Sequence, residues 1–302
     1  MKNALILCTV LLLTPAVDTG VYGQQDRIPV FHTDVSVVNI FCTVQKKKEY
    51  LTNLTRNDFR IYEDGVPQEI TYFSLERGAD AQPLNIVLLI DTSGSVKDKL
   101  FFEQEAAAIF LEETLRKDKD LAAVVQFDSE INLAQDFTYD IDLLKNSIGS
   151  LRAGGATKLY DAVYLAVDEL LRHETGRNVL VVLSDGDDTQ SLVTDKEAIK
   201  MAQDNDVVIF GIGVQGGRSR ADFGTLKRFA RETGGLFFNS KVRLENLREA
   251  FSKINHAIKN QYAIAYVSTN QERDGSFREI KVEVKLKGVK IVHRKGYYAP
   301  ES

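Results

Sequence analysis

The segment IVLLIDTSGSVKD, residues 86–98, joins an apolar run to a cluster of acid and hydroxyl side chains. Its first five residues, Ile86 to Ile90, are all apolar, which is typical of a strand buried on both faces. It continues into Asp91, Ser93 and Ser95, which are spaced two residues apart. A buried strand that runs directly into such a cluster predicts a polar site beyond the strand end of a parallel sheet.

Short apolar runs alternate with helical patterns through the middle of the chain. Strands are expected at 86–90, 121–127, 179–184 and 207–212, and helical patterns cover Phe102–Leu115, Leu159–Leu171 and Leu226–Arg231. Buried strands that are separated by helices form parallel sheets. We therefore expect an α/β domain over residues 84–260, with a doubly wound, mainly parallel sheet and helices on both faces.

The two flanks of this domain, residues 30–78 and 261–300, show the two-residue alternation of β-strands. Neither flank has enough strands for a stable sheet alone, but together they supply about six. We predict that both flanks form one small sandwich-like β module into which the α/β domain is inserted. Two separate small β modules are the alternative.

The amino-terminal residues have the pattern of a secretory signal peptide. Lys2 precedes the apolar run Ala4 to Leu13, and small residues stand before Gln24. We predict that residues 1–23 are removed and that the protein is exported, to the periplasm, cell surface or medium. The apolar run is shorter than the ~20 residues of a membrane-spanning helix, so no transmembrane segment is expected in the mature chain. Cys42 is then the sole cysteine, which rules out an internal disulfide.

Composition and motifs argue against two other classes of binding protein. A net charge of −5 gives no attraction toward a phosphate backbone, so no nucleic-acid partner is expected. The segment GIGVQG, residues 211–216, fits a dinucleotide-binding pattern, but its glycines belong to the end of a strand and the next helix begins too late.

Two further oxygen-bearing residues occupy positions equivalent to the first cluster. Thr157 in GGATKLYDA stands just before a helix, and Asp185 in VLVVLSDGDD follows the next buried strand. Together with Asp91, Ser93 and Ser95 they form a set of hard oxygen ligands without His or Cys, which favours Mg²⁺, with Mn²⁺ or Ca²⁺ possible. Because the hydroxyls add no charge, the ion would keep its attraction for a carboxylate from outside.

This set resembles the metal-ion-dependent adhesion site of von Willebrand factor type A domains, in the same order and on the same elements. The segment LKRFARETGGLFFN, residues 226–239, is similar to the penultimate helix and last strand of that fold. The segments at 54–74 and 294–300 resemble a bacterial exported group, the VWFA-related domain proteins. The chain departs from that group at QKKKEY, residues 45–50, where a Gly-containing turn is common.

The resemblance implies a fold, a metal site and export, in which the hydroxyls and Thr157 coordinate the ion directly and the aspartates coordinate directly or through water. We expect a metal-dependent adhesion or protein-binding module rather than an enzyme, with a partner protein that offers an acidic side chain. A scaffold with a purely structural ion is the alternative. A metal-assisted hydrolase is less favoured, because no convincing general base is present. The sequence indicates neither the identity of the ligand nor an oligomeric state.

Overall fold

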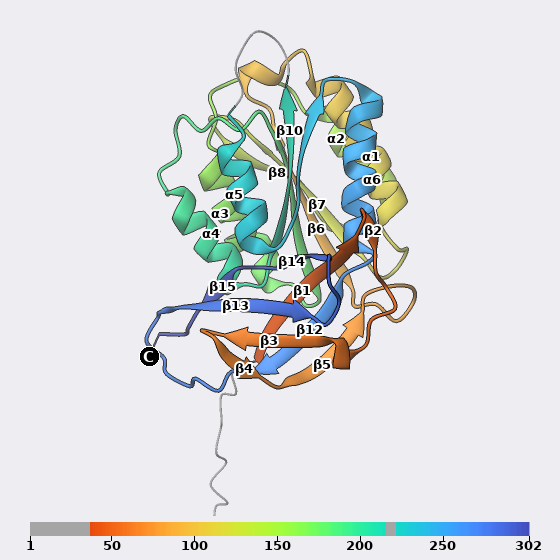
Figure 1. Ribbon diagram of the computed structural model, residues 1–302. Coiled ribbons are helices and arrows are strands. Elements are labelled where there is room, and N and C mark those ends of the chain that lie inside the picture. Colours follow the sequence, from red (N-terminus) through yellow and green to blue (C-terminus); the bar gives the residue numbers. More distant parts are fainter. Residues whose placement is uncertain (1–36, 216–221, 302) are drawn as a thin grey trace, which may run out of the picture. The chain divides into compact units, whose positions relative to one another are not determined.

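The structure is a computed structural model of the chain, and it describes residues 37–215 and 222–301 (Figure 1). The predicted signal peptide, residues 1–23, lies outside the described residues. None of the helices in the described part of the chain is both long and apolar enough to cross a membrane.

A six-stranded sheet forms the centre of the α/β part, with the strand order β11-β10-β9-β6-β7-β8. Its strands are β6 (Leu84–Asp91), β7 (Leu121–Phe127), β8 (Ile131–Thr138), β9 (Arg177–Ser184), β10 (Val208–Gln215) and β11 (Phe237–Lys241). All neighbours pair in parallel except β8, which is antiparallel to β7. The predicted fold class, a mainly parallel sheet in an α/β domain, is confirmed.

Helices cover both faces of this sheet (Figure 1). One face carries α1 (Leu100–Thr114), α2 (Ile141–Ser150) and α6 (Leu244–Ile258), and the other carries α3 (Leu159–Leu165), α4 (Asp195–Asp204) and α5 (Gly224–Thr233). The alternation along β6 explains both layers, because successive side chains of a strand point to opposite faces. Ile86, Leu88 and Ile90 join the cluster under α1 and α6, whereas Val87 and Leu89 join the opposite one.

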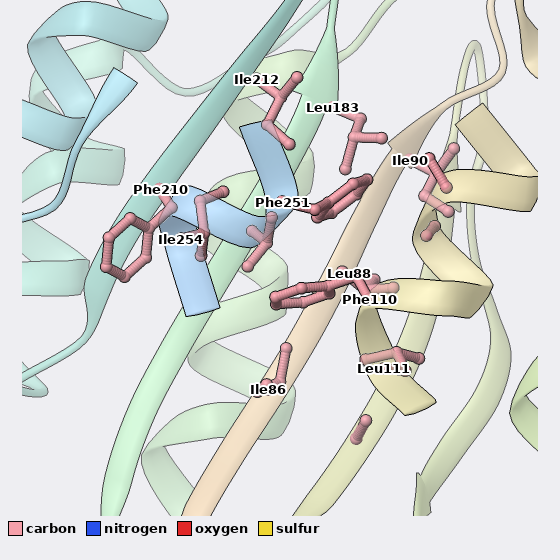
Figure 2. Packing of buried hydrophobic residues seen from close by; sticks show 14 of the residues in the cluster. Ile86, Leu88, Ile90, Phe110, Leu111, Leu183, Phe210, Ile212, Phe251 and Ile254 are labelled. Carbon is pink, nitrogen blue, oxygen red and sulfur yellow. The ribbon is translucent and has the colours of Figure 1, made fainter. Parts of the chain in front are cut away.

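The cluster under α1 and α6 is the larger of the two cores of the α/β part (Figure 2). Phe110 of α1 stacks on Phe251 of α6 with ring centroids 4.7 Å apart. Burying an aromatic side chain of this size contributes about 2–3 kcal/mol. This packing holds α1 and α6 together over the face of the sheet that carries Ile86, Leu88 and Ile90.

Two elements differ from the expectations. The helix predicted over 159–171 ends as α-helix at Leu165 and continues as a π turn, Ala166–Leu170, and a 3₁₀ turn, Leu171–His173. The apolar pattern could not distinguish these forms, because Ala166, Val167 and Leu171 stay buried throughout. Strand β8 gave no clear signal, since most of its side chains are partly or fully exposed.

The flanks combine into two further sheets. The first has the order β14-β1-β12-β5 with β2 on β1, and the second has the order β15-β13-β3-β4. Their strands are β1 (Val37–Lys46), β2 (Glu49–Tyr50), β3 (Phe59–Glu63), β4 (Val66–Gln68), β5 (Ile70–Leu75), β12 (Tyr262–Val267), β13 (Phe277–Val284), β14 (Lys290–Val292) and β15 (Gly296–Tyr298). Each sheet contains strands from both flanks, as predicted for a β module that the α/β domain interrupts.

A shared apolar core and one buried carboxylate connect these two sheets. Ile40 and Tyr262 of the first sheet and Ile61 and Ile280 of the second belong to the same buried cluster. Glu63 is 2% exposed and accepts hydrogen bonds from the hydroxyls of Tyr266 (2.7 Å), Ser268 (2.5 Å) and Tyr297 (3.0 Å). Three donors satisfy a charge that would otherwise be costly to bury.

Two buried arginines connect the β module to the α/β part. Arg177, the first residue of β9, donates from Nη2 to the Ile258 carbonyl (2.6 Å) and to Gln261 Oε1 (2.7 Å), where α6 leads into β12. Arg294, which precedes β15, donates to Asp206 Oδ1 (2.6 Å) and to the Gln203 carbonyl (3.1 Å). We call these contacts the junction. Arg177 stands at the amino end of β9, and Asp206 stands just before the amino end of β10. The junction therefore lies at the amino ends of the parallel strands, and their carboxyl ends lie at the opposite edge of the sheet.

Candidate metal centre

The polar cluster begins with Asp91, the last residue of β6, whose side chain is fully buried. Its Oδ1 accepts a hydrogen bond from the Ser93 backbone N–H (2.8 Å), and its Oδ2 accepts one from Ser184 Oγ (2.6 Å). The first bond folds the chain back in a tight turn, and the second crosses to the neighbouring strand β9. Asp91 therefore fixes the loop of residues 91–95, which we call the ion loop.

A chain of hydroxyls connects the ion loop to Asp185. Ser93 Oγ lies 3.0 Å from Ser95 Oγ, and Ser95 Oγ donates to Asp185 Oδ2 at 2.6 Å. Asp185 follows β9 and is 7% exposed, and its Oδ1 is buried without a hydrogen-bond partner among the described residues. The structure thus brings four of the five predicted residues into one continuous group.

Thr157, the fifth predicted residue, is joined to this group through its backbone. The Gly94 N–H donates to the Gly155 carbonyl (3.0 Å), which places the Thr157 segment against the ion loop. The Thr157 carbonyl accepts bonds from Thr189 N–H (2.9 Å) and Gln190 N–H (3.1 Å) of the segment that follows Asp185. Three segments of the chain therefore meet at this edge of the sheet, and Thr157, at 5% exposure, lies between two of them.

The segment after Asp185 requires a glycine. Gly186 has φ +91°, and a Cβ atom there would stand 2.3 Å from the Asp222 carbonyl oxygen. Its N–H also donates to Ser184 Oγ (3.0 Å), the same hydroxyl that binds Asp91. Gly186 thus allows a sharp turn of the chain. With this turn, Ser184 binds Asp91, and Asp185, which follows Ser184, binds Ser95.

The electrostatics of the site favour a cation. Burial raises the pKa of the Asp91 carboxyl to about 6, and the negative charge of Asp185 adds to the rise, while hydrogen bonds from Ser184 and Ser93 oppose it. The pKa of Asp187 is also raised, by burial and then by the charges of Asp185 and Asp222. A bound dication would lower both values, because it favours the charged form of a nearby carboxylate.

Three functional candidates had no clear signal in the sequence. Ser184 donates a hydrogen bond to Asp91. The other two are buried charged residues that follow the ion loop in the chain, Lys99 and Glu103. Lys99 Nζ is 3.6 Å from Asp185 Oδ2, and the charges of Asp91, Lys99 and Asp185 all act on Glu103. The four-residue spacing of Lys99 and Glu103 places them on one helical face, but exposed ion pairs have the same spacing. The sequence alone therefore could not show that these two side chains are buried.

The chemistry of the donor set fits a hard divalent ion. Two carboxylates and three hydroxyls supply oxygen ligands with two negative charges, which suits Mg²⁺, Mn²⁺ or Ca²⁺. The described residues contain no group of three or more His, Cys, Asp or Glu side chains placed to hold a metal. An ion at this site would therefore depend on the hydroxyls, and the orphaned Asp185 Oδ1 is an oxygen that an ion would satisfy.

Comparison with known families identifies the domain. The family model of the von Willebrand factor type A domain matches residues 85–278, more than half of the chain. The chain belongs to this family. Von Willebrand factor type A domains are generally interaction modules without catalytic activity, and those with a metal-ion-dependent adhesion site (MIDAS) bind divalent metal ions.

Solved structures of other von Willebrand factor type A proteins share the fold. A protein of this type from Catenulispora acidiphila is 13% identical with a TM-score of 0.51, over 90% of this chain and 76% of its own. BatB from Bacteroides thetaiotaomicron is 16% identical with a TM-score of 0.50, over 59% and 100%. Proximal thread matrix protein 1 from the mussel byssus, solved with a zinc-occupied MIDAS motif, is 17% identical with a TM-score of 0.50, over 62% and 48%. No curated protein matches the sequence.

Proposed function

We propose that this von Willebrand factor type A protein is an exported, metal-dependent module that binds a partner protein through an acidic side chain. Asp91, Ser93, Ser95, Thr157 and Asp185 would hold a divalent ion at the carboxyl edge of the sheet. The bound ion would supply an electrophilic centre with a position for an outside carboxylate. The chain's own residues position the ion and leave it accessible.

The single observation that carries this proposal is the chain of contacts from Ser93 through Ser95 to Asp185. It brings two hydroxyls of the ion loop and a carboxylate of a second segment within 3.0 Å of their neighbours. The chain of contacts ends at Asp185 Oδ2, and the other oxygen of that carboxylate, Oδ1, has no partner in the described part of the chain. A buried carboxylate oxygen without a hydrogen bond is costly. A bound ion would offset that cost.

The surroundings of the site support binding of a protein. Gly94 and Ser95 are exposed, so the ion loop is open to solvent on one side. Phe101, in the first turn of α1, is 68% exposed, and Leu192, in the segment between Asp185 and α4, is 91% exposed. Large apolar side chains at such exposure favour a partner with apolar contacts beside its acid. These exposed positions favour recognition over a purely structural ion.

Mg²⁺ is the ion we propose, because the donor set is all oxygen and Mg²⁺ commonly keeps exchangeable positions. The zinc in the mussel byssus protein is a property of that protein, and it identifies Zn²⁺ as the competitor to include. Export rests on the signal-like pattern of residues 1–23.

Thermal unfolding with Mg²⁺ or with EDTA tests the ion site. At a hundred times its dissociation constant, an ion that binds only the folded state adds about 2.7 kcal/mol. For a protein of this size we expect a rise in melting temperature of roughly 5–10 °C. The rise should vanish in Asp91→Ala and Asp185→Asn and persist in Asp98→Asn, which alters an exposed acid just beyond the ion loop. Identical curves in Mg²⁺ and EDTA would contradict the proposal.

Partner capture tests the binding function separately. Immobilised protein should retain a partner from a source extract in Mg²⁺, release it in EDTA, and fail to retain it as the Asp185→Asn variant. A partner that stays bound in EDTA would instead support a scaffold with a structural ion.

A further inference from the structure

Three carboxylates and one ammonium group are buried together where β6 ends and α1 begins. Asp91 and Glu103 are fully buried, Lys99 is 5% exposed and Asp185 is 7% exposed. Only Asp91 and Asp185 belong to the predicted ligand set. Lys99 and Glu103 therefore require a separate account, since charged side chains are almost never fully buried without a partner.

Lys99 offsets the charge of Asp185 without taking the place of a ligand. Its Nζ lies 3.6 Å from Asp185 Oδ2 and donates a hydrogen bond to the Val214 carbonyl (3.2 Å) on β10. The distance to Asp185 is that of an ion pair rather than of a hydrogen bond. Asp185 thus has a nearby positive charge while its Oδ1 stays without a partner.

Glu103 lies one helical turn after Lys99, and the Glu103 N–H donates to the Lys99 carbonyl at 3.2 Å. Neither carboxylate oxygen of Glu103 has a hydrogen-bond partner in the described part of the chain. Lys99 attracts its charge, whereas Asp91 and Asp185 repel it. A fully buried carboxylate without hydrogen bonds destabilises the fold, so a purely structural role does not explain it.

The charges of this group match a divalent ion. When all three carboxyl groups are ionised, they and the one ammonium group sum to two negative charges, which one dication neutralises. Without Glu103, the same site with an ion would carry an excess positive charge, because Lys99 remains beside Asp185. Buried charge is tolerated when it is balanced.

We infer that Lys99 and Glu103 are positioning residues for the ion: Lys99 balances Asp185 while the ion is absent, and Glu103 balances Lys99 once an ion is bound. The inference rests on the proposed ion site. It predicts that Lys99 opposes ion binding and that Glu103, four residues later, supports it.

Opposite effects of the two substitutions distinguish this role from a structural one. Lys99→Met removes the charge that repels the ion, so Mg²⁺ should bind roughly tenfold tighter. Glu103→Gln leaves Lys99 uncompensated, so Mg²⁺ should bind roughly tenfold weaker. In the metal-free protein the melting temperature should fall for Lys99→Met and rise for Glu103→Gln. A pair that only supports the loop would weaken binding and lower stability in both variants.

The experiment is calorimetric titration of the full chain with MgCl₂ at about pH 8.5, where Glu103 is mostly ionised because its pKa is raised to about 8. Thermal unfolding in EDTA accompanies each titration. Lys97→Met and Glu105→Gln, which alter exposed residues of the same segment, are matched controls and should behave as the wild type. The double variant Lys99→Met/Glu103→Gln should return within threefold of the wild-type affinity, since both charges are removed together.

Each outcome decides the matter. Opposite shifts in affinity that cancel in the double variant support the inference. Weaker binding in both single variants, or no change in either, overturns it while the ion site stands. If Lys99→Met does not fold, weaker Mg²⁺ binding by Glu103→Gln and its recovery in the double variant still support the inference. Unchanged binding by Glu103→Gln, or no recovery in the double variant, overturns it. Absence of Mg²⁺ binding to the wild type overturns the proposed function and this inference together.

Discussion

The two edges of the central sheet bury charges in different ways. At the junction, Arg177 and Arg294 each make two direct hydrogen bonds of 2.6–3.1 Å, while the Nε atom of each has no partner among the described residues. At the ion loop, the nearest pair of opposite charges, Lys99 and Asp185, is 3.6 Å apart, and Glu103 has no hydrogen-bond partner among the described residues. The eight residues of β9 separate the two regions by about 25 Å.

This difference separates stability from function. Direct, short contacts at the junction stabilise the fold and hold two parts of the chain together. Incomplete pairing at the ion loop costs stability and leaves charge available for an ion, as expected where function requires polar groups to stay unsatisfied. Substitutions at the junction should therefore change stability without changing ion binding, whereas substitutions of the charged residues and of the strained turn at the ion site should change both.

The largest effect is expected at the junction. Arg177→Met removes two charged hydrogen bonds and leaves the Ile258 carbonyl and Gln261 without their donor, at a cost of about 3 kcal/mol. The melting temperature should fall by roughly 6–12 °C in thermal unfolding. Arg248→Met, at an exposed site on α6, is the matched control. Mg²⁺ affinity should stay unchanged, and a large loss of affinity would mean that the two edges are coupled.

A smaller loss is expected for Gly186→Ala, beside the ion loop. The φ of +91° and the approach to the Asp222 carbonyl make a Cβ atom unfavourable, at a cost of about 2 kcal/mol. Because Gly186 also donates to Ser184, the variant should lose Mg²⁺ affinity as well as stability. Chemical denaturation and calorimetric titration measure the two effects. Full retention of Mg²⁺ affinity would show that this turn does not position the site.

A pH-dependent effect is expected from Glu103. Its folded-state pKa of about 8 lies above its ordinary value of 4.5, so the folded protein binds more protons than the unfolded one between these values. The free energy of unfolding of the metal-free protein should therefore fall as pH rises, by about 1 kcal/mol between about pH 6.5 and 7.5. Asp91, with a pKa of about 6, contributes the same sign at lower pH. Glu103→Gln should flatten the upper part of the curve, and an unchanged slope would contradict this assignment.

The smallest effect is expected for Gly94→Ala, within the ion loop itself. Gly94 does not have a positive φ, and the nearest atom to an added Cβ is the Gly155 carbonyl oxygen at an ordinary 3.6 Å. Stability should change by less than about 0.5 kcal/mol, and the melting shift with Mg²⁺ should persist. Comparison with Gly186→Ala tests whether backbone conformation, rather than the presence of glycine, explains the sensitivity of this edge.

The sequence predicted the fold because its apolar periods change clearly. Buried runs such as Ile86–Ile90 and alternating flanks such as Ile280–Leu286 correspond to strands of the expected kinds. Strand β8 was missed because its exposed, polar sequence is indistinguishable from a loop, and the π turn after Leu165 was missed because it preserves the buried face of the helix.

For the site, the sequence identified groups that stand at strand ends, where side chains converge by geometry. It could not identify Lys99 or Glu103, because the function of a charged residue on a helix depends on its burial. Whether the five predicted residues hold an ion stays a prediction, which the Mg²⁺ and EDTA experiment addresses.

The pairing of β1 with β12 has a consequence for the order of folding. Val37 lies opposite Val267, so these partners are separated by most of the chain. During synthesis from the amino terminus, β1, β3 and β5 must wait for β12, β13 and β14, their partners from beyond residue 260, while the α/β part already has all its strands. The sandwich should therefore form last and slowly, since long-range pairing bears the largest loop-closure entropy. Until then, its unpaired strand edges are the segments of the nascent chain most exposed to aggregation.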